Sequence, residues 1–227
     1  MSRRLVLLVL VVLALPALAL AAGTDPTKQI STGDQRKAAS IALKRPDVAV
    51  PGWRKVAVIP SGPNGAADPG CPGYNPDQSD LILTGEAASN FEGGATKVGL
   101  ESNVFKTRGD ALASWTRAVK PALAPCLARL FKQVIEQVGG KAAIVRSGQI
   151  AFPKVAPRTA AYRVSMTVSH TEAGKTTTVP FTVHVVVLGN GRGDARLLTF
   201  GLGNGIPSAD LRAFAKLVAG RLAAAKL

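Results

Sequence analysis

The sequence predicts an α+β fold in which helices cover a largely antiparallel sheet. Three candidate strands follow one another within residues 160–200, joined by two short turns that contain glycine. Segments with apolar residues at helical spacing come before and after these strands. Strands joined by tight turns pair antiparallel, and the helices then supply the layers that bury the sheet.

Within the strand-rich stretch, residues 162–169 alternate strictly between apolar and polar, as a strand with one buried face requires. A polar turn at 172–175 leads into a second strand, whose end at 185–188 is apolar on both faces. This strand is therefore expected at the centre of the sheet. Pro180 lacks an N–H group, so it is expected at the start of that strand or at a bulge. Residues 196–200 return as a third antiparallel strand.

The elements around this group follow from periodicity, capping residues and breakers. Asp34 and Asp110 are the expected N-caps of two helices. The expected elements are a helix at 34–43, a short strand at 55–59, a long loop at 60–80, an apolar segment at 81–83, a strand at 96–106, a helix from 110, a helix from Pro121 or Pro125 to 138, a strand at 144–152 and a last helix from Pro207–Ser208.

The chain begins with the pattern of a secretory signal peptide, which we assign to residues 1–22. Arg3 and Arg4 precede an apolar run at 5–15, and small residues after it fit a cleavage site. The alternative is an uncleaved segment kept as a membrane anchor, although a spanning helix needs about 20 apolar residues. Residues 23–33 are expected to be a flexible leader, and 34–227 a single α+β domain. We therefore expect a secreted protein.

The chain has two cysteines, Cys71 and Cys126. An exported chain with an even number of cysteines favours a disulfide, here one that would fix the long loop to the domain. Two buried free thiols are the alternative. Two cysteines alone cannot close a zinc site, so we predict no metal.

The net charge of +14 lies almost entirely in the second half of the chain. From Asn103 onward there are about 18 Lys and Arg against about 5 Asp and Glu. The partners that fit this charge outside the cytoplasm are an anionic envelope polymer, a lipid or an envelope protein, and not nucleic acid. Membrane contact is expected only through an uncleaved signal segment. The alternative is that the charges are simply solvated.

The sequence contains no pattern for catalysis or cofactor binding. A Gly-x-Ser-x-Gly elbow is absent, and the two histidines, His170 and His184, lie on or beside predicted strands. We interpret His184 as packed or at the surface, and we predict no catalytic residue and no cofactor. Trp53 and Trp115 are candidates for a ligand groove, or else for the core.

Several segments together resemble a known group of domains. They are 39–43, Pro46-Asp47, Pro51-Gly52-Trp53, Cys71 in its proline-rich loop, Leu83-Thr84-Gly85-Glu86-Ala87, the strand 98–106, and Ala124-Pro125-Cys126-Leu127. The chain resembles the secreted actinobacterial domains grouped with the extracellular sensor domain of the mycobacterial kinase PknH and the LpqN-type envelope lipoproteins. It departs from them in having no kinase domain and no lipid-attachment cysteine at the expected cleavage site.

This resemblance implies a PsbP-like α/β sandwich without catalytic residues, located in a bacterial cell envelope. It also implies a role in binding a ligand or a partner. We therefore expect a non-catalytic, envelope-associated binding module. The alternatives are a secreted hydrolase of envelope material, which would need carboxylates beside His184, and a purely structural secreted domain.

Overall fold

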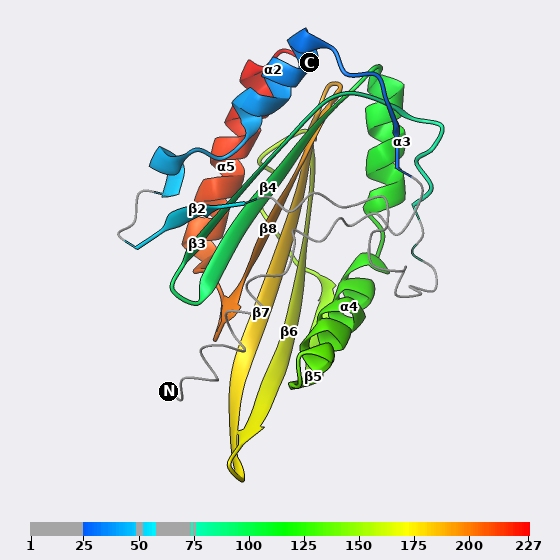
Figure 1. Cartoon of the computed structure of the whole chain (residues 1–227). Helices are drawn as coiled ribbons and strands as arrows, with labels where there is room; N and C mark the ends of the chain where they lie inside the picture. Colours follow the sequence, from blue (N-terminus) through cyan, green and yellow to red (C-terminus); the bar gives the residue numbers. More distant parts are fainter. Residues whose placement is uncertain (1–24, 49–51, 58–73, 75) are drawn as a thin grey trace.

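The computed structural model describes residues 25–48, 52–57, 74 and 76–227 (Figure 1). The expected signal peptide, Cys71 and most of the 60–80 loop lie outside the described residues. The strands are β1 (Thr27–Lys28), β2 (Arg54–Val56), β3 (Ile82–Gly93), β4 (Thr96–Phe105), β5 (Lys141–Gln149), β6 (Arg158–Glu172), β7 (Lys175–Asn190) and β8 (Gly193–Leu202). The helices are α2 (Thr32–Ile41), α3 (Arg108–Ala118), α4 (Leu123–Gln137) and α5 (Ser208–Ala224), with a 3-10 turn at Arg45–Val48.

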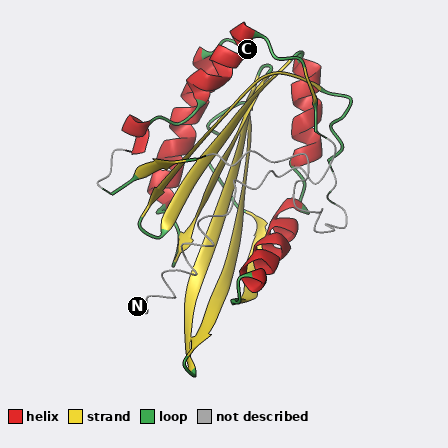
Figure 2. Cartoon of the chain, viewed as in Figure 1, coloured by secondary structure: helices red, strands yellow, loops and turns green. Residues whose placement is uncertain are grey.

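The described strands form one eight-stranded sheet in the order β1-β3-β4-β8-β7-β6-β5, and β2 also pairs with β3. Every pairing is antiparallel except the short parallel one between β1 and β3. Helices α2 and α5 lie on one side of this sheet, and α3 and α4 lie on the other (Figure 2). The predicted α+β fold, an antiparallel sheet flanked by helices, is confirmed.

The core has two main parts, one on each face of the sheet. On the α4 face, residues such as Phe131, Tyr162 and Phe181 form one cluster. On the α5 face, residues such as Val186 and Leu211 form the other. We call these two surfaces of the sheet the α4 face and the α5 face below. Among the described residues, no helix is long and apolar enough to cross a membrane.

The three strands predicted within 160–200 are β6, β7 and β8, paired as an antiparallel meander. Strand β7 is central, and it is buried on both faces from Phe181 to Gly189, as its sequence predicts. Pro180, however, lies inside β7 rather than at its start. Its carbonyl accepts from Gly203 N at 2.8 Å, just after β8 ends at Leu202, so its missing N–H points to a side that has no strand partner.

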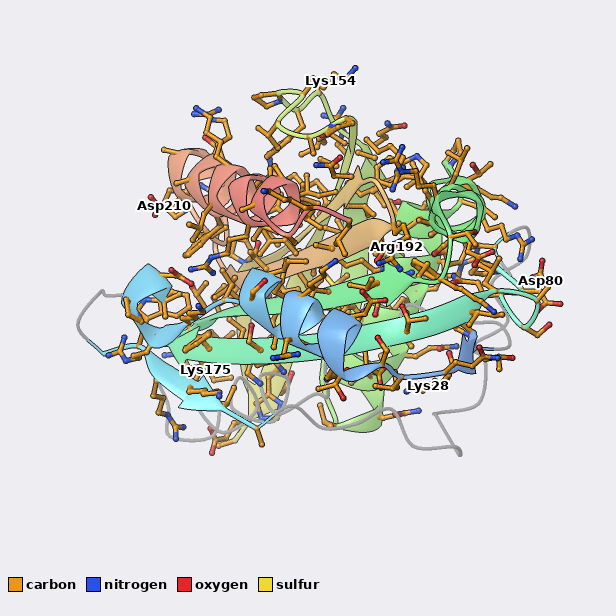
Figure 3. All side chains as sticks on the ribbon, turned by 90° about the horizontal axis from the view of Figure 1, so that it is seen from above. Lys28, Asp80, Lys154, Lys175, Arg192 and Asp210 are labelled. Carbon is orange, nitrogen blue, oxygen red and sulfur yellow. The ribbon has the colours of Figure 1, made fainter. Side chains whose placement is uncertain are left out.

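The expected cap of the first helix was assigned to the wrong residue. Helix α2 begins at Thr32, and the side chain of Ser31 accepts from Asp34 N as its N-cap. Asp34 instead forms a bidentate pair with Arg192, at 2.9 and 3.1 Å, and accepts from Thr84 Oγ1 at 2.7 Å. These hydrogen bonds, led by those from Arg192, lower the pKa of Asp34. Figure 3 shows Arg192 between α2 and α3. Through its pair with Asp34, Arg192 links α2 to the β7–β8 turn.

Two further expectations need similar corrections. Asp110 is not an N-cap but the N3 residue of a capping box whose N-cap is Thr107. Residues 25–33, the described part of the expected flexible leader, contain β1 and the first residues of α2. Backbone hydrogen bonds from Thr27, Gln29 and Ser31 to the 81–84 segment hold it against the sheet edge.

The largest error concerns β3, for which the sequence predicted only an apolar segment at 81–83. The strand continues to Gly93 because β4 pairs with it along nearly its whole length. Its residues are small or polar, and such residues have low strand propensity. Phe91 is buried against the α5-face core, and Ser89 Oγ accepts from Leu43 N at 3.0 Å. The other strand ends differ from the predicted ones by a few residues, as is usual at element ends.

Candidate ligand site on the sheet

The structure does not bring the two candidate tryptophans together. Trp115 packs against the core of the α4 face, and Trp53 packs against the core of the α5 face. Trp53 lies against the backbone of Gly93, where a Cβ would approach the indole to 2.6 Å. A groove lined by both side chains is therefore absent from the described part of the chain.

The space between Trp115 and the sheet is filled by the side chain of Arg158. Its guanidinium carbon lies 6.0 Å from the centre of the Trp115 ring, and one of its nitrogens donates to the carbonyls of Gly191 and Gly193. On the sheet side, the guanidinium lies close to Gly189, where a Cβ would meet Arg158 Nε at 2.4 Å. The stack fixes α3 to the turn between β7 and β8.

Asp194 lies beside this stack and is only 2% exposed. Ser114 Oγ of α3 donates to its Oδ2 at 3.4 Å, and Arg196 and Arg158 are nearby cations. Burial nevertheless raises the pKa of the Asp194 carboxyl, against the opposite effect of these groups. The cluster joins α3 to β8 through an internal charge network, which is a structural role.

The alternative of a hydrolase required a carboxylate beside His184, and the described residues supply none. Asp194 shares the α4 face with Leu198 and Phe200, whereas His184 shares the α5 face with Val186. The charged group that acts on the pKa of His184 is a cation, Arg163. Within the described residues there is also no group of three or more His, Cys, Asp or Glu that could hold a metal ion.

A second polar cluster lies on the α5 face, in one row across three strands. Thr199 of β8 is paired with His184 of β7, which is paired with Arg163 of β6. Each of the three has a buried side-chain atom that has no hydrogen-bond partner among the described residues: Thr199 Oγ1, His184 Nδ1 and Arg163 Nε. Thr199 is 0% exposed and His184 is 7% exposed. Directly paired residues share a face, so the three side chains are neighbours.

Three unpartnered polar groups in one row are a feature that needs an explanation, because native proteins rarely leave such groups unsatisfied. The row marks the boundary between two halves of the α5 face. On one side, Val186 and Leu197 are covered by α5. On the other side the next row holds Arg146, Ser165 and Thr182, so the surface becomes polar and basic.

The electrostatics of the row favour an anion. Burial and, to a smaller degree, the positive charge of Arg163 together lower the pKa of His184 to about 4. The imidazole is therefore neutral at neutral pH and can donate one hydrogen bond and accept another. Arg163 forms no ion pair within the described residues, so its charge is available to a ligand.

The sequence reading placed His184 correctly as a packed histidine but did not identify this row as a site. The signal was present, because Arg163 and Ser165 fall on the polar side of the alternation in 162–169, and Thr182 and His184 fall on the polar side of the next strand. What the sequence could not show is the register that sets His184 opposite both Arg163 and Thr199.

The predicted disulfide between Cys71 and Cys126 stays a prediction, because Cys71 lies outside the described residues. Cys126 is 5% exposed, in the first turns of α4. Intact mass spectrometry with iodoacetamide should show no alkylation before reduction and two alkylated thiols after it. Reduction should also destabilise the fold by about 4 kcal/mol on the chain-entropy argument. Alkylation of the unreduced, unfolded protein would contradict the prediction.

No family model matches the sequence, and no curated protein matches it. Among solved structures, the chain is similar to the extracellular domain of PknH from Mycobacterium tuberculosis, with a TM-score of 0.41 and 9% sequence identity. The match covers 82% of this chain and 95% of that chain. This similarity is distant and defines neither a ligand nor a mechanism.

Proposed function

We propose that this chain is a secreted, non-catalytic binding module of the bacterial cell envelope. It binds an anionic group at the row formed by Thr199, His184 and Arg163. The observation that carries the proposal is the set of unpartnered buried polar atoms in that row, together with the charge of Arg163, which forms no ion pair within the described residues. An anion there would accept hydrogen bonds from Arg163 and from the hydroxyl of Thr199. It would also accept a hydrogen bond from the imidazole of His184.

Arg163 and His184 contribute differently to the binding of an anion. Arg163 supplies charge and planar donors, which suit a carboxylate or a phosphate oxygen. His184 supplies a neutral donor whose pKa should rise when an anion binds, because the negative charge of the anion favours the charged imidazole and offsets the effect of Arg163. The affinity for the anion should therefore increase as the pH falls from about 6.5 toward 4.

Nuclear magnetic resonance of the imidazoles tests this directly, since the chain has only two histidines. Titration with inorganic phosphate should shift the His184 signals and raise its pKa from about 4. The signals of His170 should not move with phosphate and serve as the internal control. The variant Arg163→Gln should lose the phosphate response.

Two results would overturn the anion site: an absence of any phosphate effect on His184, or an unchanged effect in Arg163→Gln. Lys120→Gln is the matched control, because Lys120 is an exposed cation just before α4, among the helices of the α4 face. It should retain the full response of the wild-type protein. Native mass spectrometry of the protein from its own culture medium would then identify an anionic ligand that co-purifies with wild type and not with Arg163→Gln.

A further inference from the structure

The row at His184 is the first of four successive rows on the polar half of the α5 face. The pairings of β5, β6 and β7 define the next three. They are Arg146–Ser165–Thr182, then Ala143–Thr167–Pro180, then Lys141–Ser169–Thr178. We call these four rows, from Arg163 to Lys141, the basic strip. Six residues of β6 separate its ends, which corresponds to a length of about 20 Å.

The basic strip carries cations and hydroxyl groups but no acidic side chain. Its cations are Arg163 in the His184 row, Arg146 in the next row and Lys141 in the fourth row. None of them forms an ion pair within the described residues. Some other cations of the sheet form ion pairs with carboxylates, as in Lys97–Glu92 and Arg196–Glu101. The three cations of the basic strip have no such pair within the described residues, and they lie along one surface.

The strip is accessible along β5 and part of β6, whereas its members Thr182, His184 and Thr199 are buried. Lys141, Ala143 and Arg146 are exposed, and Ser165 and Thr167 are half-buried. Strands β6 and β7 carry the strip toward the hairpin that extends beyond the other strands (Figure 1). Ser169 and Thr178 at its far end already share a hydrogen bond of 2.8 Å, so their hydroxyls are held in place.

We propose that the ligand is an extended acidic polysaccharide that lies along the basic strip, with one acidic group at the His184 row and others at Arg146 and Lys141. This inference rests on the proposed function and names the class of its ligand. Cations spaced along about 20 Å match repeated acidic groups on a chain better than one small anion. The half-buried hydroxyls of Ser165 and Thr167 between them can exchange hydrogen bonds with sugar hydroxyls.

Two other polyanions fit this surface less well. Its rows contain no aromatic side chain, whereas proteins that bind single-stranded nucleic acid stack bases on aromatic rings. The apolar members of its rows are only Ala143 and Pro180, with the exposed Val145 beside them at the β5 irregularity, whereas a surface that enters a lipid headgroup layer carries several large apolar anchors. Single-stranded DNA and anionic phospholipid vesicles are therefore the comparison ligands of the test.

Calorimetric titration with a polygalacturonate oligomer tests the proposal, with monomeric galacturonate as its single-site equivalent. The oligomer should bind at least about tenfold more tightly than the monomer, and the binding should weaken with added salt. The double variant Arg146→Gln/Lys141→Gln should lose about tenfold in affinity for the oligomer and keep its affinity for the monomer. The matched double variant Lys120→Gln/Arg129→Gln removes two cations from the other side of the sheet and should bind like wild type.

Equal affinities for oligomer and monomer, or an equal loss in both double variants, would overturn the extended ligand. Tighter binding of phosphatidylglycerol vesicles or of single-stranded DNA, with the same dependence on Arg146 and Lys141, would overturn the polysaccharide in favour of that polyanion. The phosphate response of His184 separates these failures from failure of the proposed function. If that response is present while the oligomer fails, the anion site stands and the polymer does not.

Discussion

Replacing Phe131 by alanine is expected to lower the free energy of unfolding by about 3–5 kcal/mol, the cost typical of a fully buried aromatic side chain. Phe131 of α4 is 0% exposed. Its ring lies 5.8 Å from the centre of Phe181 in β7 and 6.0 Å from that of Phe200 in β8. The three rings fix α4 to the centre of the sheet, and truncation would leave a cavity there.

Urea unfolding monitored by circular dichroism measures this effect. The control is Leu112→Ala in α3, whose side chain is 53% exposed and should cost less than about 1 kcal/mol. Equal losses in the two variants would show that the aromatic cluster does not hold α4 on the sheet.

The pH dependence of stability should contain a term of about 3 kcal/mol from His184. Its pKa is about 4 in the folded protein, below the ordinary value of 6.5, because burial and Arg163 disfavour the charged imidazole. The unfolded chain therefore binds more protons than the folded one between these pH values. The stabilising contribution is complete above pH 6.5 and is lost as the pH falls toward 4.

The variant His184→Gln isolates this term. Glu101 and Asp194, whose pKa values burial raises, titrate in both proteins and cancel when the two profiles are subtracted. The difference between wild type and variant should fall by about 3 kcal/mol from pH 7 to pH 4. A difference that stays constant with pH would show that His184 is accessible and titrates like a free histidine. The experiment uses a buffer without phosphate, because an anion at the row would oppose the effect.

Much of the fold could be predicted from local patterns. The alternation at 162–169 and the two-sided apolar end of the next strand identify β6 and β7 and the central place of β7. Both patterns are reliable predictors, because burial of one face of a strand requires alternating apolar residues and burial of both faces requires a continuous apolar run. Strand β3 could not be predicted beyond residue 83, since its small and polar residues form a strand only when β4 pairs with them.

The candidate site was likewise only partly predictable from the sequence. The sequence indicates an excess of cations in the second half, a packed His184 and no catalytic pattern. It also suggested Trp115 and Trp53 as a pair, but the sheet separates them because they belong to opposite core layers. Trp115 instead covers Arg158, a contact between residues far apart in the chain.

Local sequence patterns were enough to predict the α+β class, the antiparallel meander and the basic character of the second half, because these follow from residues that are close in the chain. The structure was needed to show that Asp34 pairs with Arg192 and that Thr199, His184 and Arg163 lie in one row. Those contacts depend on strand register and on helix placement. Both are set by long-range pairing and by burial against other elements, which no local pattern encodes.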